Sequence, residues 1–320
     1  MIILPYAISN IHLLSRINAP SGGVYTGEGC ILSKQTILVI GSTGTQGTKV
    51  VDGLINSDKF SIKALTRDKS SDSAISLANN GVELIEGNMD DLESLNAAMK
   101  GVYGVFFIAV GTDWFDTTGP ETEITRGSNV IQAANKNEIE HIVFSGVSGG
   151  NRSIGVPQFE TKGAIERALT ASGLGYTILR PVSFMDNFNR NQNAIKKGRF
   201  SDILSPNKTQ WFISVQNIAD FTVAAFLNPE RFSGKEIDLA GDAMTLPDVA
   251  KIFTKVLGIE VKYNYIEEDD RDRLPEPMKI MNGFYEREGY LVDIDKLKKE
   301  WGIPLMTVDK WILQEPGWLD

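Results

Sequence analysis

Apolar and polar residues follow two alternating periodicities between Thr36 and Arg180. Short, mostly apolar runs rich in Val, Ile and Phe predict buried strands, because they are too short for helices. Between these runs, apolar residues recur at the three- and four-residue spacing of a helix with one buried face. The predicted strands are Thr36–Ile40, a run within Ser61–Lys69, Val82–Glu86, Tyr103–Val110, His141–Ser145 and Tyr176–Arg180. The predicted helices are Thr48–Ile55, Asp90–Lys100, Glu121–Lys136 and Glu160–Ser172.

This alternation predicts the fold class. Strands and helices that alternate in units of about thirty residues form βαβ units and a parallel sheet. The run Tyr103–Val110 is apolar throughout, as expected for a parallel strand that is buried on both faces. Pro181 ends the regular pattern. We therefore predict an α/β fold, a Rossmann-type doubly wound parallel sheet with a smaller C-terminal substrate lobe.

Three glycines with a spacing of three follow the first predicted strand. Gly41 permits a sharp turn, Gly44 permits close approach of the backbone to a pyrophosphate, and Gly47 permits packing of helix on strand. Unpaired N–H groups at the start of the helix then face the phosphates. The alternative is a glycine-rich turn without a ligand. The flanking strand and helix, with a second signal about 20 residues further on, favour a dinucleotide site.

That second signal is the end of the second predicted strand, where a dinucleotide fold contacts the adenine ribose. An acidic residue there favours NAD, whereas an arginine accommodates the 2′-phosphate of NADP. Arg67 comes first and Lys69 follows, so a phosphate meets a fork-shaped cation before it meets a carboxylate. Asp68 is still able to reach a ribose hydroxyl, and a solvated charged loop is the alternative. The sequence therefore favours NADP(H) as cofactor.

Beyond Pro181 the pattern loosens. We predict a helix over Val215–Leu227, a short strand over Glu236–Leu239, and a helix from the capping sequence Thr245-Leu-Pro-Asp248 to Val256. The acidic stretch Glu267–Asp272, with Pro275 and Pro277 after it, is expected to form an exposed loop.

The N-terminal segment, residues 1–33, has a different composition. It begins apolar, but it lacks a basic n-region and contains Pro5, so it is a poor secretory signal. Its scarcity of acidic residues weakly resembles an organellar transit peptide. We expect an extension outside the core fold. The expected organisation is an N-terminal extension (1–33), an NADP-binding Rossmann domain (34–180) and a substrate lobe (181–320) whose elements can cross back to the sheet.

Composition narrows the classes of function. The net charge is −9, from 32 basic and 41 acidic residues, and no dense basic run is present, which argues against direct binding to nucleic acid or anionic membranes. No apolar run is long enough for a membrane helix. The single cysteine, Cys30, excludes an intrachain disulfide and suits the cytoplasm. His12 and His141 alone offer little for a metal site, so none is expected. A Ser-His-Asp hydrolase is likewise not expected.

Six motifs together carry a resemblance to a known family. They are Gly41-x-x-Gly44-x-x-Gly47, Leu65-Thr-Arg67-Asp, Gly87-Asn-Met-Asp-Asp91, Val143-Phe-Ser-Gly-Val147, Phe159-Glu-Thr-Lys162-Gly-Ala-Ile-Glu166 and Tyr176-Thr-Ile-Leu-Arg180-Pro-Val-Ser-Phe-Met-Asp-Asn187-Phe. In this order they resemble the NmrA-like family over residues 34 to 310. This family is an atypical branch of the short-chain dehydrogenases that includes isoflavone-reductase-like enzymes. The last two motifs discriminate it from other dinucleotide-binding proteins.

The resemblance implies a changed catalytic centre. Ordinary short-chain dehydrogenases use Tyr-x-x-x-Lys, but Gln158 stands four residues before Lys162. Val147, between Ser145 and Ser148, holds the place of the usual serine. Isoflavone-reductase-like relatives share this break, which leaves Lys162 as the candidate acid/base group. The alternative is a surface lysine paired with Glu166, although Lys162 lies close to the apolar stripe of its helix.

The candidate site residues lie in these motifs and at the ends of predicted strands. Lys162 is the catalytic candidate. The candidate cofactor-binding residues are Gly41, Thr43, Gly44, Thr45, Gln46, Gly47, Arg67, Asn88, Met89, Ala109, Val110, Lys162 and Pro181.

The family resemblance leaves the activity open. The first hypothesis is an NADPH-dependent reductase of a small, rather apolar carbonyl, enone or imine-like compound. The second is an NADP(H)-sensing regulator that binds a protein partner without turnover, and a weaker third is an epimerase or dehydratase, which the missing tyrosine disfavours. Aromatic candidates for a substrate pocket, each with core packing as its alternative, are Trp114, Phe115, Phe184, Phe188, Trp211 and Phe212.

Overall fold

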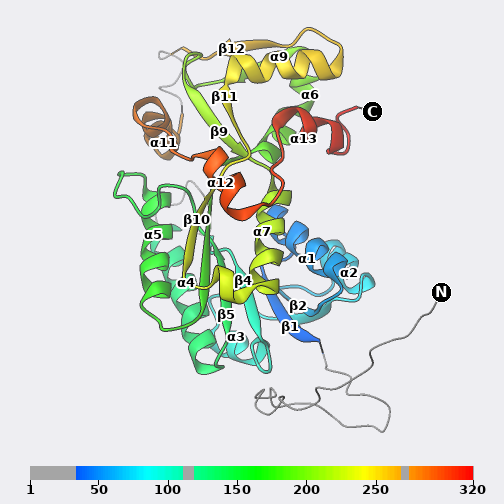
Figure 1. The fold of residues 1–320 in the computed structure, drawn as a ribbon, viewed down its shortest axis with the longest axis vertical. Coiled ribbons are helices and arrows are strands. Elements are labelled where there is room, and N and C mark those ends of the chain that lie inside the picture. Colours follow the sequence, from blue (N-terminus) through cyan, green and yellow to red (C-terminus); the bar gives the residue numbers. More distant parts are fainter. Residues whose placement is uncertain (1–33, 111–118, 268–273, 320) are drawn as a thin grey trace, which may run out of the picture. The chain divides into compact units, whose positions relative to one another are not determined.

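The structure is a computed structural model that describes residues 34–110, 119–267 and 274–319. The chain divides before Gln35, and Gln35–Asp320 form one compact unit. Within the described residues, parallel strands build a seven-stranded sheet in the order β10-β6-β5-β4-β1-β2-β3 (Figure 1). Their bounds are β1 Gln35–Ile40, β2 Phe60–Thr66, β3 Glu83–Glu86, β4 Gly104–Phe107, β5 His141–Ser145, β6 Tyr176–Pro181 and β10 Lys235–Leu239. The chain leaves β1 toward one edge and returns at β4 to build the other, so the predicted doubly wound sheet is confirmed.

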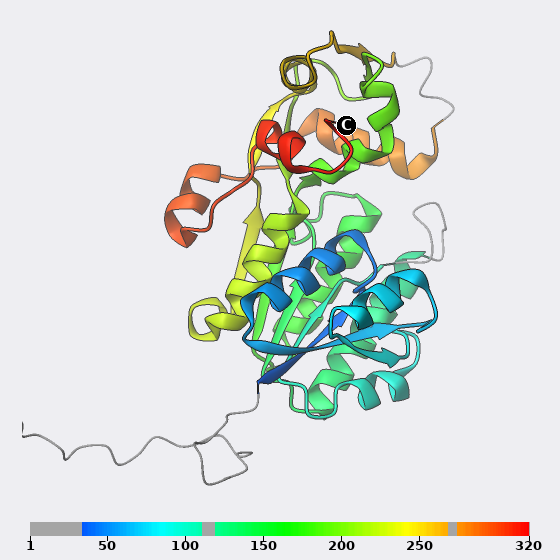
Figure 2. The same cartoon turned by 90° about the vertical axis from the view of Figure 1, so that its right-hand side faces the viewer.

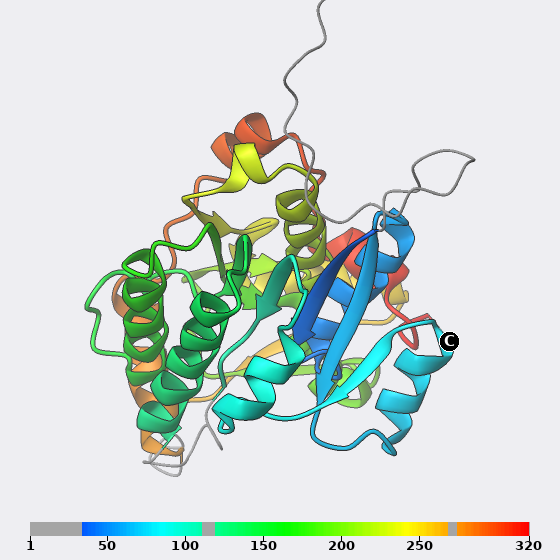
Figure 3. The ribbon, with the colours of Figure 1, turned by 90° about the horizontal axis from the view of Figure 1, so that it is seen from below.

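Helices cover both faces of this sheet (Figure 3). Their bounds are α1 Thr45–Ser57, α2 Asp72–Asn79, α3 Leu92–Ala98, α4 Gly119–Lys136, α5 Pro157–Thr170 and α7 Val215–Leu227. Alternate residues of β1 point to opposite faces. Ile37 and Val39 belong to the core cluster that includes α1 and α7, and Leu38 and Ile40 belong to the cluster that includes α3, α4 and α5. The sheet is therefore buried on both sides, as its apolar strands predict.

The fourth strand is shorter than the sequence suggests. We expected it to run from Tyr103 to Val110, but β4 ends at Phe107. The carbonyl groups of Ala109 and Val110 instead accept hydrogen bonds from the side chains of Lys162 and Arg126. These two residues do not continue the strand, because side chains from two helices, rather than a neighbouring strand, supply the hydrogen-bond donors for their carbonyl groups.

Of the elements beyond β6, α7 and β10 belong to the large sheet and its covering layer, and most of the others build the lobe. β6 continues through Val182 into β7, and β10 continues through Ala240 toward β11, so both strands lead at their carboxyl ends into the lobe (Figures 1 and 2). Its strands form the sheets β11-β9-β7 and β12-β8. The strands are β7 Ser183–Phe184, β8 Arg199–Asp202, β9 Thr209–Ile213, β11 Asp242–Thr245 and β12 Lys262–Tyr265. The lobe helices are η1 Met185–Asn191, α6 Gln192–Ile195, α9 Leu246–Leu257, α11 Glu276–Arg287 and α13 Val308–Gln314. The helices α8 Pro229–Phe232 and α12 Ile294–Trp301 instead place Phe232 and Trp301 in the cluster that includes α1 and α7.

Two predictions in this part of the chain have clear outcomes. Helix α9 begins after Thr245, whose hydroxyl oxygen accepts a hydrogen bond from the N–H of Asp248, so the predicted cap is confirmed. The predicted loop around Pro275 and Pro277 is wrong in its second half, because α11 begins at Glu276. Proline is tolerated in a first helical turn, where its missing N–H has no intrahelical partner to lose. Residues 268–272 of the acidic stretch lie outside the described residues.

Among the described helices, none combines the length and apolar character that a bilayer-spanning segment needs.

Candidate functional site

The glycine corner, residues Gly41–Gly47, joins β1 to α1. Gly41 has a φ of +84°, which favours glycine, and the N–H of Gly44 donates to its carbonyl at 3.0 Å. A Cβ at Gly47 would lie 2.1 Å from the Gly41 carbonyl oxygen, so only glycine fits there. The turn and the first turn of the helix are therefore packed backbone to backbone.

The start of α1 fits an anionic group. Gly44 caps the helix without a side-chain hydrogen bond, and the first turn contains no acidic residue. Thr43, Gly44 and Thr45 are exposed at this end. Backbone N–H groups in a first helical turn, with the helix dipole behind them, bind phosphate. The residues present thus suit the pyrophosphate of a dinucleotide.

The two halves of the sheet separate at this corner. β1 lies between β2 and β4, so its carboxyl end and that of β4 border the topological switch point, where ligands bind in open α/β sheets. Ala109 and Val110 follow β4 on the opposite side of the switch point from Arg67, which follows β2. Ala109 is buried and Val110 is exposed. The candidate cofactor residues are thereby brought to one edge of the sheet.

Gln46 connects the glycine corner to the neighbouring half of the sheet. The buried hydroxyl of Ser145, at the end of β5, donates to Gln46 Oε1 at 2.7 Å. Ser148 is also buried, and its N–H donates to the Pro181 carbonyl at 3.0 Å. The Ser145 hydroxyl therefore has a structural role, and Ser148 is held through its backbone.

Arg67 lines a small polar pocket at the end of β2. The pocket has a volume of about 260 Å³ and is lined by Arg67, Glu86, Gly87, Asn88, Asp91 and Ser94. Asp68 Oδ1 accepts hydrogen bonds from both the N–H and the hydroxyl of Ser70, at 2.8 and 2.6 Å. These hydrogen bonds lower the pKa of Asp68. Arg67 thus faces a pocket at the expected 2′-phosphate position, while one oxygen of Asp68 is turned to its own loop.

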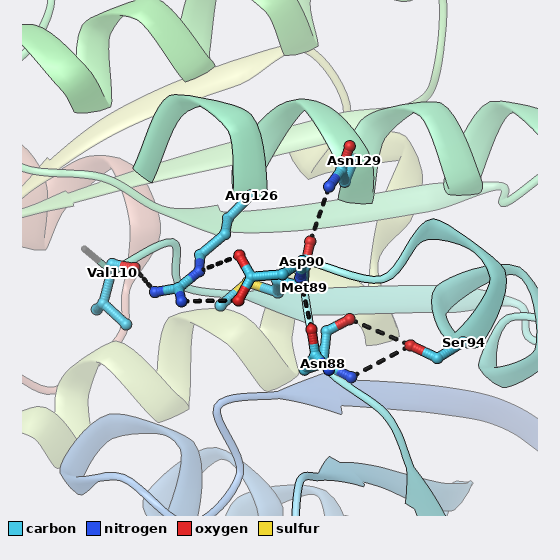
Figure 4. Close-up of polar contacts among 7 residues, drawn as sticks. All are labelled: Asn88, Met89, Asp90, Ser94, Val110, Arg126 and Asn129. Carbon is cyan, nitrogen blue, oxygen red and sulfur yellow. Dashed lines mark hydrogen bonds and ion pairs between the residues drawn. The ribbon is translucent and has the colours of Figure 1, made fainter. Parts of the chain in front are cut away.

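Side chains of helix α4 form hydrogen bonds with the loops that follow β3 and β4 (Figure 4). The sequence did not reveal these contacts. Arg126 donates to both carboxylate oxygens of Asp90, at 2.7 and 2.8 Å, and to the Val110 carbonyl at 2.8 Å. One turn further along α4, Asn129 Nδ2 donates to the Met89 carbonyl at 2.9 Å. The Arg126 hydrogen bonds lower the pKa of Asp90. The three-residue spacing on one helix face was the available signal, but it did not identify the partners.

The start of α3 holds the remaining part of this loop. Ser94 donates from its hydroxyl to the Asn88 carbonyl and accepts from the Asn88 N–H, both at 3.2 Å. Asn88 Oδ1 in turn accepts the N–H of Asp90 at 2.8 Å. Asn88 and Met89 are therefore fixed through backbone contacts beside the Arg67 pocket.

Lys162 lies on α5 and reaches the end of β4. Its ammonium donates to the Ala109 carbonyl and forms an ion pair with Glu123 of α4. The side chains of Lys162 and Glu123 are only 14% and 9% exposed. The considered partner Glu166 instead accepts from Arg180 at 2.9 and 2.7 Å in a buried pair. Lys162 is thus held at the carboxyl edge of the sheet by groups that are distant in sequence.

A hydrogen-bonded group of side chains lies where β6 leads into the lobe. Gln210 Nε2 donates to Ser183 Oγ at 3.1 Å, and Ser183 Oγ contacts the Tyr285 hydroxyl at 3.5 Å. The hydroxyls of Tyr285 and Tyr290 lie 3.2 Å apart. Burial raises the pKa of both tyrosines, which keeps the phenols neutral. The Tyr290 ring stacks on Phe159, one turn before Lys162.

The aromatic pocket candidates separate into three groups. Phe188 and Phe212 pack against each other in the buried core of the lobe, so core packing holds for these two. Phe184 and Trp211 are half-buried. Trp114 and Phe115 lie outside the described residues. No group of three or more potential metal ligands occurs in the part of the chain that the structure describes.

Comparison with known proteins agrees with this architecture. Residues 33–311 match the sequence profile of the NmrA-like family. An NmrA-like family domain-containing oxidoreductase, FrzB of Cladobotryum sp, is 27% identical over 286 residues, which cover 79% of this chain and 84% of the relative.

Two solved structures share the fold. Triphenylmethane reductase of Citrobacter sp., complexed with NADP(H), has a TM-score of 0.73 and 23% identity over 87% of this chain and 99% of its own. NmrA, a negative transcriptional regulator in complex with NADP, has a TM-score of 0.70 and 15% identity over 88% of this chain and 94% of its own. The match to the family profile extends over most of the chain, from before β1 into α13. The chain therefore belongs to the NmrA-like family.

Proposed function

We propose that the chain is an NADPH-dependent reductase of a small, rather apolar compound with a carbonyl, enone or imine-like double bond. The observation that carries this proposal is the position of Lys162, whose ammonium contacts the Ala109 carbonyl beside the switch point of the sheet. The FrzB relative, which is an oxidoreductase, and triphenylmethane reductase, which was solved with NADP(H), support it.

The cofactor follows from the donors at the sheet edge. The first turn of α1 suits the pyrophosphate, and Arg67, beyond β2, suits the 2′-phosphate. The nicotinamide end is then expected on the other side of the switch point, where Ala109 and Lys162 lie. When bound there, NADPH supplies a hydride. The chain's own task is to orient the substrate and to supply a proton.

Lys162 has the hydrogen-bonding capacity for that task. An ammonium carries three hydrogens; Lys162 donates one to the Ala109 carbonyl and is bound to the Glu123 carboxylate as an ion pair. The ammonium therefore retains donor capacity for a ribose hydroxyl or a substrate heteroatom. Gln158, at the position of the usual tyrosine, has no proton to transfer at neutral pH. We therefore assign proton delivery to Lys162.

The substrate class is inferred from the side chains where β6 leads into the lobe. Half-buried Phe184 and Trp211 offer apolar surface, while the neutral hydroxyl of Tyr285 offers a hydrogen bond. Side chains of this kind suit a molecule with a large apolar body and few polar atoms.

The test is the transfer of deuterium from NADPH labelled stereospecifically at C4 to a panel of quinones, enones, imines and triphenylmethane dyes. We expect transfer from one face of the nicotinamide only. Lys162→Met should lower kcat by roughly 10²- to 10⁴-fold, the usual loss for an acid/base group. The affinity for NADPH should change far less, because the glycine corner and Arg67 bind the phosphates.

Lys59→Met is the matched control, because Lys59 is an exposed lysine beside the amino end of β2, at the opposite edge of the sheet. If Lys162→Met keeps the turnover of the parent, Lys162 is not the proton donor. Tight NADPH binding without deuterium transfer to any acceptor would favour an NADP(H)-sensing regulator instead.

A further inference from the structure

Helix α4 presents two charged residues, one turn apart, to the carboxyl edge of the sheet. Glu123 pairs with Lys162, and Arg126 binds Asp90 and the Val110 carbonyl. Residues three apart on a helix share one face. A single helix therefore contacts the segments that follow β3 and β4 and the lysine of α5.

The charges along this edge alternate in sign. Arg67 is near enough to Asp90 to contribute to the lowering of its pKa, and Glu123 is near enough to Arg126 to contribute to the raising of its pKa. With the ion pairs Asp90–Arg126 and Glu123–Lys162, this gives a series of alternating charges from Arg67 to Lys162. Each inner member has opposite charges on both sides. Figure 4 shows the Arg126 part of this series.

The burial of Glu123 shows that the pair is more than a surface contact. Burial of a charged carboxylate that is only 9% exposed costs free energy unless the carboxylate is paired. Even when it is paired, a buried ion pair adds little net stability to a fold. An apolar pair would stabilise two packed helices equally well. What the carboxylate supplies is a fixed direction for the lysine, whose long side chain otherwise samples many rotamers.

We propose that Glu123 is a positioning residue, which holds the Lys162 ammonium against the Ala109 carbonyl at the cofactor site. This inference rests on the proposed function for its effect on turnover. The position of the lysine follows from its contacts in the structure and is independent of the proposed function.

The experiment compares Glu123→Gln, an isosteric change, with Glu121→Gln. Glu121 is on the same helix but exposed, so the control makes the same change in charge without a buried partner. We expect Glu123→Gln to lower kcat by roughly 10- to 100-fold, the size of effect that misplacement of a reacting group by about 1 Å produces. KM should change by less than about threefold, because a positioning effect acts mainly in the transition state.

The double variant Glu123→Gln/Lys162→Met should be no slower than Lys162→Met, because Glu123 acts through the lysine. Losses that multiply, or a Glu123→Gln enzyme that behaves like Glu121→Gln, would overturn the proposal.

Two further measurements do not use turnover. Acetic anhydride should label Lys162 severalfold faster in Glu123→Gln than in the parent, as measured by peptide mass spectrometry. Lys162→Met should lower Tm, since it leaves a buried carboxylate unpaired, and addition of Glu123→Gln should restore part of that loss. Unchanged labelling, or a Tm loss that the second change does not reduce, counts against Glu123. If both measurements respond while Lys162→Met keeps its turnover, the positioning inference stands and the proposed catalytic role of Lys162 fails.

Discussion

Arg67 and Lys162 are the two cations on which the proposed cofactor site depends, and they are held differently. Arg67 is exposed and lines an open polar pocket. Lys162 is largely buried and bound by the Ala109 carbonyl and the Glu123 carboxylate. An exposed cation gains most from a strongly charged ligand, whereas a buried lysine with fixed partners is pre-organised. Arg67 is therefore suited to affinity and Lys162 to chemistry.

Replacement of Arg67 by alanine is expected to narrow the preference for NADPH over NADH. The 2′-phosphate loses a bidentate partner, and a hydrogen bond to a charged group contributes about 1.5–3 kcal/mol, which corresponds to roughly 10- to 100-fold in affinity. NADH affinity should change little, because its ribose has no phosphate there. Calorimetric titration with both cofactors measures this, with Lys69→Ala as the comparison. Equal affinities of the parent for the two cofactors would refute the assignment.

At the scale of elements, buried polar contacts join neighbouring strands as well as helices. His141 of β5 is buried, and its Nε2 lies 2.9 Å from Thr177 Oγ1 of β6. Thr177 donates its own hydrogen to the Phe232 carbonyl, so the histidine Nε2 carries the proton and donates. Burial lowers the pKa of His141 to about 4. His141 therefore has a neutral imidazole in the folded chain.

This gives a pH dependence of stability with a defined sign. The pKa of His141 in the folded chain, about 4, is below the ordinary value of 6.5. The stability that comes from the neutral histidine is therefore fully present above pH 6.5, and it is lost as pH falls from 6.5 toward 4. Between pH 7.5 and 5.5 the free energy of unfolding should fall by about 1.4 kcal/mol. Urea denaturation at the two pH values measures it. In His141→Gln this difference should be nearly absent; an unchanged difference would assign it to other groups.

At the scale of the whole molecule, Gln35–Asp320 contain the cores on which the fold depends. One apolar cluster lies on each face of the sheet and a third fills the lobe. Two strands, β6 and β10, lead from the sheet into the lobe. A unit with its own buried cores is expected to fold independently of what precedes it.

Deletion of residues 1–33 is therefore expected to leave folding and NADPH affinity nearly unchanged. The first strand begins at Gln35, and the donors at the glycine corner follow it. Thermal unfolding and cofactor titration of the shortened chain check this, and size-exclusion chromatography follows its oligomeric state. Insolubility, or a change in oligomeric state, would show that the segment has a structural role.

The sequence determined the features that depend on neighbours along the chain. It predicted β5 over His141–Ser145 and α7 over Val215–Leu227 with the bounds that the structure has, because local periodicity records which side chains are buried. It also predicted the glycine corner, since the contact between Gly41 and Gly47 spans a single turn. The parallel sheet followed from the alternation of these local patterns.

Tertiary structure decided which distant groups meet. Glu123 pairs with Lys162, and Arg126 with Asp90, only because the sheet order places α4 beside α5 and over the loops after β3 and β4. The same order ends β4 before Ala109, whose carbonyl turns to Lys162. Periodicity reports that a residue is buried, but it does not report its partner, because partners are chosen by the packing of whole elements. The lysine was therefore visible in the sequence, whereas the carboxylate that holds it was not.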